Sequence, residues 1–429
     1  MDITQEKEMK NRKHNMKLYP FYEMIGYDVL FYMGIRVMFL SEVKGFNDAQ
    51  IMLSTTLFAL FQIVLQMPVT LIITKIGKRY GAIIGNVFTI LWAVVLIFLN
   101  NFALLILSQL LYSIGYAFKY MSEANLLSDS IPESSAQNKI YTNIDKRAFS
   151  RYCFLSAIST VIAGYAYNFN KFMPLILSLI FILMTTIISF NFVDIEKKKQ
   201  RRNKESQEIK KYIKELRQGY RFVINSKRLR ALLLFTGLIW GTITLVQTFE
   251  LLLLQYLGVS AEIIGLIFAG LEMVKAVYSR KAVHFNNVFG NKSLLNILGC
   301  YALVWILVGV IAQVEIGTIA KLTIIIFMLV LLAALNSIYQ ILAKKYFNNF
   351  TNAKILPSIY SIKSISDNLF RIITTLIGTL LLSFVNVEIA ILITGILLVI
   401  SAIIVNAYSN NKLGLEPEKY TQKDIYIRK

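Results

Sequence analysis

The chain has 429 residues, of which 56% are hydrophobic, and its mean hydropathy is +0.58. Soluble domains are only about half apolar even when glycine is counted, so this composition excludes an ordinary soluble protein. The formal net charge is +20, but Lys and Arg lie in polar links between long apolar segments rather than along one binding face. This distribution argues against nucleic acid as a partner and indicates basic residues beside a membrane.

Several kinds of chemistry lack their motifs in this chain. Cys153 and Cys300 lie in separate apolar segments and show no zinc-type or C-x-x-C spacing. His14 and His284 lie in polar links, so we expect no metal centre within the membrane. The phosphate-binding G-x-x-x-x-G-K-[ST] loop is missing, as are G-x-S-x-G and H-E-x-x-H. We therefore predict that the protein is not an enzyme and needs no cofactor.

Twelve long apolar segments dominate the chain. A run of about 20 apolar residues can cross the hydrocarbon core of a bilayer as a helix. The first 17 residues are charged and precede a segment too long for a secretory signal, which predicts a tail and a retained first helix. In chain order, the predicted helices lie at 19–41, 49–74, 82–100, 102–121, 146–167 and 171–193, and then at 231–256, 262–283, 293–313, 317–343, 357–384 and 387–409.

The links between these segments are alternately basic and almost free of Lys and Arg. In the first half, one basic link holds Lys75, Lys78 and Arg79. The links that alternate with the basic ones hold only Lys44 and Lys171. Basic links collect in the cytoplasm, so an even number of helices with both termini cytoplasmic fits this rhythm. We expect a tail at 1–18, a six-helix bundle at 19–193, a basic linker at 194–230, a second six-helix bundle at 231–410 and a tail at 411–429.

The linker contains a helical pattern of its own. Apolar and aromatic residues recur at helical spacing between lysines and arginines, namely at Ile209, Tyr212, Ile213, Leu216 and Tyr220. This pattern predicts a basic amphipathic helix at the cytoplasmic face of the membrane. A solvated linker helix is the alternative.

The organisation as a whole resembles the major facilitator superfamily, over residues 18–410. The family's loop signature between helices 2 and 3 reads G-x-L-x-D-R-x-G-R-R, and residues 70–79 match it at Gly77, Lys78 and Arg79, with Lys75 keeping the charge. Thr74 stands in place of the aspartate, which puts the usual gating by that residue in doubt. The resemblance implies an all-α membrane protein of twelve transmembrane helices in two pseudo-symmetric six-helix bundles that alternate in access around a central cavity. Lys75, Gly77, Lys78 and Arg79 would form its cytoplasmic gate loop.

Further motifs indicate which branch of the superfamily the chain resembles. The arginine that family antiporters often carry in helix 4 is Leu111 here, and only Gly164 remains of the glycine–proline motif of drug antiporters in helix 5. The segment from Gly115 to Phe118, with the polar residues that follow it, resembles a branch of bacterial permeases whose substrates are unassigned.

Charged residues inside the apolar segments are candidate functional groups, because a charge at the centre of a bilayer costs at least about 2.5 kcal/mol. Asp28, Tyr32 and Arg36 follow at spacings of four, which places them on one side of a continuous first helix. A carboxylate can take up a proton in dry surroundings and release it when water or a cation enters, so Asp28 is the first candidate for proton coupling. A structural tie between Asp28 and a base on another helix is the alternative.

Two further pairs lie in the second half. Glu272, with Lys275 three residues on, is the second candidate for coupling, although the two side chains can neutralise each other. Asp367 and Arg371 stand four residues apart and can likewise pair. Arg371 can instead bind an anionic group of a substrate through two parallel hydrogen bonds.

Polar and aromatic side chains mark one face on each of helices 4, 7 and 10. In the family, helices 1, 4, 7 and 10 line the cavity, so the resemblance implies a pocket for a partly apolar organic solute. Hydrogen bonding between packed helices is the alternative for any one of these residues. Besides Tyr32 and Arg371, the predicted cavity residues are Gln109, Tyr112, Tyr116, Trp240, Thr244, Gln247, Asn336, Tyr339 and Gln340.

These observations predict a secondary active transporter whose partners are a small-molecule substrate, protons and the lipid bilayer. Proton-coupled export of a drug-like or amphipathic metabolite is the first hypothesis, and proton-linked uptake of a small nutrient is the second. Translocation of a lipid or lipid-linked sugar is a third hypothesis, and a sensor that transports nothing is a fourth. Abundant Lys, Asn and Ile are typical of an AT-rich bacterial genome, which favours the plasma membrane. We expect a monomer, as is usual for the fold.

Overall fold

A computed structural model describes residues 3–132, 137–195, 214, 217–350 and 356–409. These residues form helices joined by turns, without a strand among them. They fall into two compact units. The first comprises residues 1–45, 57–209 and 260–269, and the second comprises residues 46–56, 210–259 and 270–429. The bundle boundaries predicted from the sequence remain predictions.

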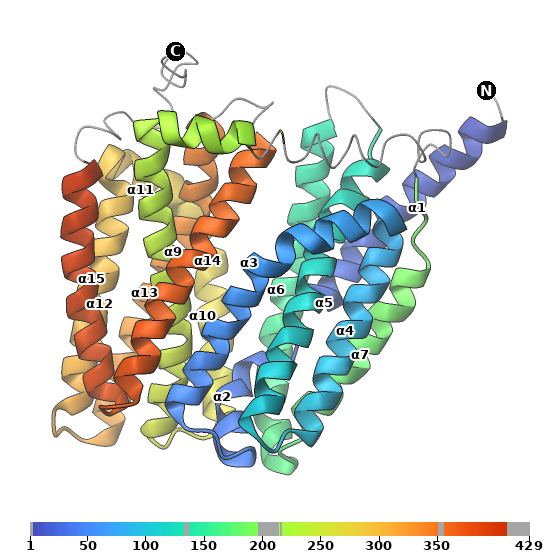
Figure 1. Ribbon diagram of the computed structural model, residues 1–429. Helices are drawn as coiled ribbons and strands as arrows, with labels where there is room; N and C mark the ends of the chain where they lie inside the picture. Colours follow the sequence, from blue (N-terminus) through green and yellow to red (C-terminus); the bar gives the residue numbers. More distant parts are fainter. Residues whose placement is uncertain (1–2, 133–136, 196–213, 215–216, 351–355, 410–429) are drawn as a thin grey trace. The chain divides into compact units, whose positions relative to one another are not determined.

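Most of the helices are long, and they follow one another closely along the chain (Figure 1). In the first half they are α1 (Ile3–Gly26), α2 (Arg36–Met38), α3 (Asp48–Ile76), α4 (Lys78–Phe98), α5 (Phe102–Ser130), α6 (Gln137–Phe169) and α7 (Met173–Phe190). In the second half they are α9 (Lys227–Tyr256), α10 (Ala261–Tyr278), α11 (Ala282–Phe289), α12 (Ser293–Gln313), α13 (Thr318–Phe350), α14 (Leu356–Leu382) and α15 (Val387–Ser409).

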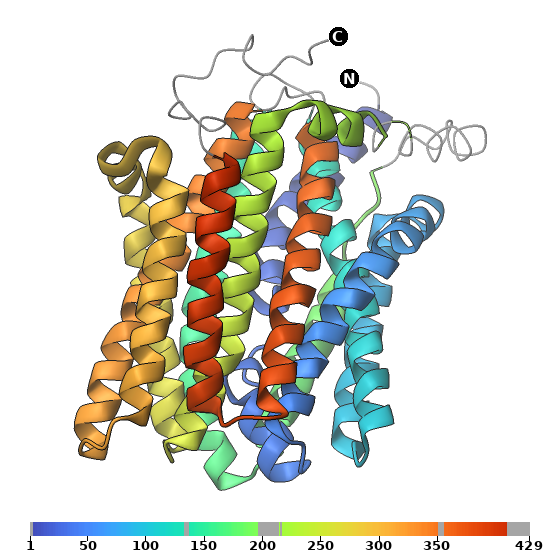
Figure 2. The same ribbon diagram turned by 60° about the vertical axis from the view of Figure 1, so that its left-hand side comes forward.

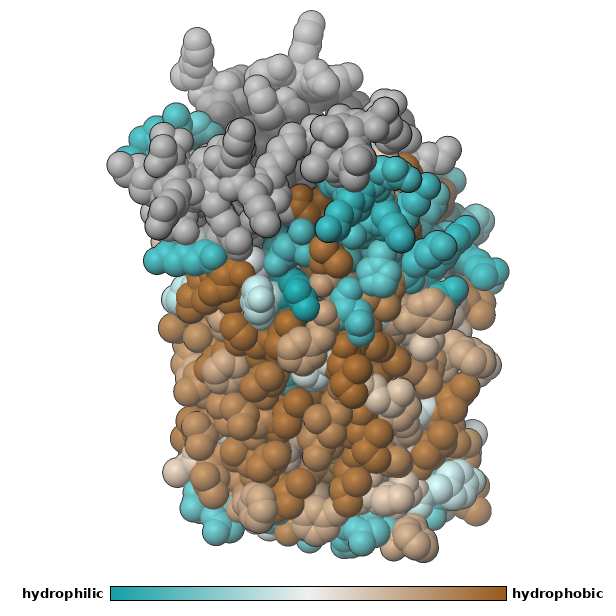
Figure 3. Space-filling view, turned by 90° about the vertical axis from the view of Figure 1, so that its right-hand side faces the viewer, coloured by the Kyte–Doolittle hydropathy of each residue, from teal (hydrophilic) through white to brown (hydrophobic). Residues whose placement is uncertain are grey.

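Nine helices in the described part of the chain are long and apolar enough to cross a membrane. The other three predicted spans fall on α1, α6 and α10. Charged residues interrupt α1 and α10, and polar residues lower the hydropathy of α6. Figure 3 shows a broad band of hydrophobic side chains with hydrophilic ones above and below it, as a bilayer requires.

The prediction of one continuous helix at 19–41 is wrong. Residues 3–18, expected to form a tail, are the first turns of α1, which ends at Gly26. Residues 27–32 are not helical, and a 3₁₀ turn (Met33–Ile35), α2 and a π turn (Phe39–Val43) follow. Phe31 has a positive φ of 67°, which a helix does not contain. Asp28, Tyr32 and Arg36 therefore do not share the face of one helix.

Two side chains from other helices stabilise this break. The Lys119 ammonium, from α5, donates to the carbonyl of Gly26, and the Ser178 hydroxyl, from α7, donates to the carbonyl of Leu30. Within a bilayer there is no bulk water to satisfy a free carbonyl, so a non-helical segment requires such partners. We refer to residues 27–32 as the helix break.

One other predicted span also differs from the structure. The span predicted at 262–283 ends at Tyr278, and a 3₁₀ turn (Ser279–Lys281) leads into the short helix α11. In the linker, Ile209, Tyr212, Ile213 and Leu216 lie outside the described residues. Tyr220 lies in a helical stretch, 217–225, with its ring exposed.

Helices α4 and α5 cross at two glycines. A Cβ atom on Gly85 would lie 2.9 Å from the carbonyl oxygen of Gly115, and a Cβ atom on Gly115 would lie 2.9 Å from the carbonyl oxygen of Gly85. Without side chains at these positions, the two backbones come into direct contact, as small residues allow between membrane helices. This contact fixes the position of α5, which carries Tyr112 and Lys119.

We predict that Gly85→Ala destabilises the protein by about 1–3 kcal/mol, because the added methyl group overpacks the crossing. Thermal unfolding of the purified protein in detergent measures this loss. Gly299→Ala in α12 is the matched control, because a Cβ atom there meets no atom within 4 Å. Alanine is the better helix former by about 1 kcal/mol, so the control should be neutral or stabilising. Equal effects of the two substitutions would contradict the prediction.

Candidate functional site

Asp28 lies in the helix break and is the centre of the candidate site. Its Oδ1 atom accepts the backbone N–H of Val29 at 2.7 Å and the hydroxyl of Tyr112 at 3.1 Å. The cations close enough to act on it electrostatically include Lys119 and Arg36. The structure thus brings together Asp28, Arg36 and Tyr112 from the sequence prediction, although through a break rather than along a helix face.

Lys119 was not recognised as a site residue from the sequence. The apolar pattern places it at the start of a polar link, in a helix predicted to end at 121, but α5 continues to Ser130. Its ammonium lies at the carboxyl end of α1, where it donates to Gly26. A cation at this end of a helix is stabilised by the exposed carbonyl groups and by the helix dipole.

Two more carboxylates lie close by, Glu23 about one turn before the end of α1 and Glu123 one turn after Lys119 on α5, and neither was predicted from the sequence. Glu23 has only 6% of its surface exposed, and its electrostatic neighbours include Glu123, Lys119 and Asp145. Glu123 accepts a hydrogen bond of 2.6 Å from the Tyr22 hydroxyl. The spacing of Lys119 and Glu123, four residues apart, was the available signal.

A group of aromatic rings lies beside these charges in the first unit. The ring of Tyr27 lies 4.4 Å from that of Tyr152 and 5.4 Å from that of Phe149, centroid to centroid. Tyr116 stacks on Tyr120 at 6.0 Å. Tyr27, Tyr116, Tyr120 and Phe149 are exposed, and Tyr27 interacts electrostatically with Glu23 and Asp28. Exposed rings beside carboxylates suit an amphipathic solute, particularly one that carries a positive charge.

The remaining predicted residues of the first half occupy different environments. Tyr32 is buried, and its ring packs edge-on against those of Trp92 and Phe39, with centroids 5.4 and 5.7 Å away. It therefore belongs to the packed interior of the unit. Gln109 is half-buried on α5, on the same helix as Tyr112 and Tyr116.

In the second unit, two predicted pairs have different outcomes. Glu272 and Lys275 form an ion pair of 2.7 Å, so these two charges neutralise each other. Asp367 does not form the expected pair with Arg371. It binds Lys363 instead, one turn earlier on α14. Lys363 and Arg371 both stand four residues from Asp367, so the spacing alone does not predict which of them pairs with it. Arg371 is half-buried.

The predicted cavity residues of α9 and α13 form hydrogen bonds both within one helix and between the two helices. The Tyr339 hydroxyl donates to the carbonyl of Thr236 at 2.8 Å, and its side chain is buried. Thr244 donates to the carbonyl of Trp240 at 2.9 Å, and Gln340 donates to Asn336 at 3.1 Å. Gln247 is exposed. Tyr339 therefore takes part in packing between helices rather than in lining a cavity.

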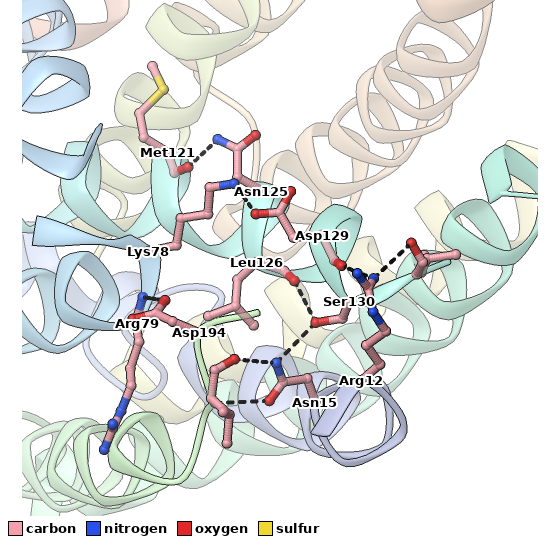
Figure 4. Close-up of polar contacts among 12 residues, drawn as sticks. Arg12, Asn15, Lys78, Arg79, Met121, Asn125, Leu126, Asp129, Ser130 and Asp194 are labelled. Atoms are coloured by element: carbon pink, nitrogen blue, oxygen red, sulfur yellow. Dashed lines mark hydrogen bonds and ion pairs between the residues drawn. The ribbon is translucent and has the colours of Figure 1, made fainter. Parts of the chain in front are cut away.

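The predicted gate loop lies in a polar network at one end of the first unit (Figure 4). Gly77 separates α3 from α4 with a φ of 94°, a conformation that suits glycine. Lys78 forms an ion pair with Asp129 at the end of α5. The Arg79 backbone N–H donates to Asp194 at 3.1 Å, and its guanidinium donates to the carbonyl of Phe190 at 2.6 Å. Lys75 is exposed.

The same network includes α1. Arg12 donates to the carbonyl of Asp129 at 2.5 Å, and Asn15 donates to the Ser130 hydroxyl at 3.1 Å and to the carbonyl of Val193 at 2.7 Å. Four segments of the first unit, α1, α4, α5 and the residues after α7, are thereby joined at this end (Figure 4). No pattern in the sequence indicates Arg12, Asn15 and Asp129 as partners, because they lie far apart in the chain.

We predict that Lys78→Gln and Asp129→Asn each lower the melting temperature and that the double variant loses less than the sum. The pair is partly exposed, so a coupling of about 0.2–1 kcal/mol is expected. Thermal unfolding of the four proteins measures this coupling. The more exposed pair of Lys171 and Glu42, 3.1 Å apart, provides the control and should give a smaller coupling. Strict additivity for Lys78 and Asp129 would show that the contact adds no stability.

Comparisons with known proteins agree with this architecture. The chain is similar to the nucleoside transporter NupG (TM-score 0.71, 12% identity, 92% of this chain and 99% of that one) and to a POT family transporter in complex with 5-aminolevulinic acid (0.69, 12%, 93% and 96%). It is also similar to a bacterial homolog of the human lysosomal transporter Spinster (0.66, 13%, 97% and 98%). No curated protein matches the sequence.

At such low identity these similarities establish the fold alone. The sequence model described as Major Facilitator Superfamily matches residues 24–313, which is more than half of the chain. The chain therefore belongs to the Major Facilitator Superfamily and is a multi-pass membrane transport protein.

Proposed function

We propose that the protein is a proton-coupled secondary transporter that exports an amphipathic organic solute, with Asp28 as the coupling carboxylate. The observation that carries the proposal is the position of Asp28, a carboxylate within an interrupted membrane helix. Ionisable residues at membrane depth are rare and mark ion or substrate routes. Discontinuous helices are a common way for transporters to present backbone and side-chain groups to a solute.

The surroundings of Asp28 favour proton exchange. In its ionised form, Asp28 accepts the Tyr112 hydroxyl and the Val29 N–H and faces Lys119 and Arg36. A bound proton removes the charge that holds these donors. Because the break is held by side chains from α5 and α7, a change in the charge of Asp28 can alter how the two helical pieces meet. This is the link between protonation and conformation that coupling requires.

Glu23 and Glu123 add to the proposed coupling site. Together with Asp28 and Asp145 they supply four carboxylates, against the cations Lys119 and Arg36 that act on them. Such a group of charges, of which Glu23 is buried and the other three are half-buried, favours the uptake of at least one proton or of a positively charged solute. Competition between the two at one site would give exchange of solute for protons.

The substrate class rests on the exposed aromatic rings beside these acids. Tyr27, Tyr116 and Tyr120 offer ring faces to an apolar body, and Glu23 and Asp28 offer negative charge to a basic group. These features favour an amphipathic cation over a sugar or an anion.

We place the protein in the bacterial plasma membrane, with its basic links and both termini in the cytoplasm.

We predict that Asp28→Asn abolishes proton-dependent export. Cells that express the wild type should expel a fluorescent cationic dye, and a protonophore should stop this efflux. Asn cannot carry the proton, so the rate of efflux by the variant should be at least about tenfold below that of the wild type. A tenfold change in rate corresponds to about 1.4 kcal/mol in the barrier. Glu42→Gln is the control, because Glu42 pairs with the exposed Lys171 outside the site.

Equal membrane levels of both variants are required for this comparison. Efflux by Asp28→Asn at the wild-type level would overturn the role of Asp28. If well-expressed wild type expels no dye, the export proposal fails, and substrate-dependent alkalinisation of the medium then tests proton-linked uptake.

We predict that Tyr112→Phe lowers the same efflux by at least about tenfold, because a hydrogen bond to a charged group is worth about 1.5–3 kcal/mol and tenfold corresponds to about 1.4 kcal/mol. The substitution removes one hydroxyl and keeps the ring that packs against Trp92, with centroids 4.8 Å apart. Tyr165→Phe, at an exposed tyrosine on α6, is the matched control. Unchanged efflux in both variants would separate Tyr112 from the coupling step.

A further inference from the structure

A groove in the second unit lies outside the proposed transport site. It runs between α9, α14 and α15 and has a cavity volume of about 210 Å³. Figure 2 shows α9 between the other two helices. The groove is lined mainly by aliphatic side chains, among them Leu238 and Leu245 on α9, Ile373 and Ile377 on α14, and Leu397 and Ile404 on α15.

The polar atoms of the groove are already used within the protein. Three hydroxyls line it, and each donates to a carbonyl: Thr374 to Gly241 at 2.9 Å, Thr394 to Ile391 at 2.8 Å and Ser401 to Leu397 at 2.8 Å. An occupant is therefore offered no free hydroxyl donor, which favours a hydrocarbon over a polar solute.

The groove opens on the surface of the membrane-spanning helices. Ile373 is 53% exposed and Ile404 is 62% exposed, on α14 and α15 respectively. Both helices are among those long and apolar enough to cross a bilayer. In the membrane, the hydrocarbon that surrounds such a surface is the acyl chains of lipids. An unfilled groove would forfeit dispersion contacts, so an acyl chain is the natural occupant.

The side of α9 that lines the groove carries a cation, Lys227, at the start of the helix. Lys227, the first residue of α9, is exposed, and it stands 11 residues before Leu238 and 18 before Leu245. At 100° per residue these intervals bring all three residues to nearly the same side of the helix. The rise from Lys227 to Leu238 is about 16 Å, which is close to the hydrocarbon thickness of one leaflet.

We propose that this groove binds one acyl chain of an anionic phospholipid, with the phosphate of its headgroup at Lys227. The lipid belongs to the leaflet on the side where α9 begins and α15 ends. Basic residues at the membrane surface attract anionic headgroups. The groove supplies the contacts for the chain, and Lys227 supplies the preference for negative charge.

Native mass spectrometry of the full-length protein in detergent tests this proposal. After delipidation, phosphatidylglycerol or phosphatidylcholine is added, and the bound lipid is counted per chain. The wild type should retain one phosphatidylglycerol several-fold more tightly than phosphatidylcholine. Ser401→Phe fills the groove and should lose the retained molecule of either lipid. Lys227→Gln should keep the lipid and lose the preference for phosphatidylglycerol.

Two controls lie outside the groove. Leu303→Phe adds a ring on an exposed position of α12, and Lys344→Gln removes an exposed cation on α13. Both should behave as the wild type. Leu397→Trp fills the groove from a second position, in case Ser401→Phe does not fold. Retention by the filled variants at the wild-type level would show lipid bound only around the protein and would overturn the proposal, as would a retained molecule of detergent in place of lipid.

Discussion

The candidate site depends on one interaction, the hydrogen bond from the Lys119 ammonium to the carbonyl of Gly26. At membrane depth, a helix can end only where another group satisfies its last carbonyls. Lys119 does this for α1, and the break that follows contains Asp28. The same ammonium acts electrostatically on Asp28, Glu23 and Glu123. One side chain thus allows the helix to stop and offsets part of the negative charge that collects there.

The packing of the first unit holds this lysine in place. The direct contact of α4 and α5 at Gly85 and Gly115 sets the height and rotation of α5, and Lys119 lies one turn beyond Gly115. At the far end of the same helix, Asp129 and Ser130 are bound by Lys78, Arg12 and Asn15. Helix α5 is therefore fixed at both its middle and its end, and its charged side chains have defined positions.

The sequence was sufficient for the family and for most of the helices, because the thickness of a bilayer sets the length of each apolar run. It was not sufficient for the helix break. The residues Tyr27 to Tyr32 include no proline, and the side chains that hold the break lie 93 and 148 residues away from the carbonyls that they satisfy. The site was predicted only in part. Asp28 is visible as a charge in an apolar run, whereas Lys119 lies two residues before the end predicted for its helix and Glu123 lies beyond that end. Spacing also could not rank Lys363 and Arg371 as partners of Asp367, since both stand one turn away.

The way in which the break is closed has a consequence for motion. The carbonyl of Gly26 is held by the Lys119 side chain, and that of Leu30 accepts both the Ser178 hydroxyl and, within the break, the backbone N–H of Tyr32. A backbone hydrogen bond in a helix cannot be released without unwinding a turn, but a lysine or serine can turn about its own bonds within nanoseconds when it is not tightly held. The piece of chain beyond the break can thus tilt against α1 while every helical turn on both sides stays intact, which makes this segment a joint that begins at Gly26 and contains no proline.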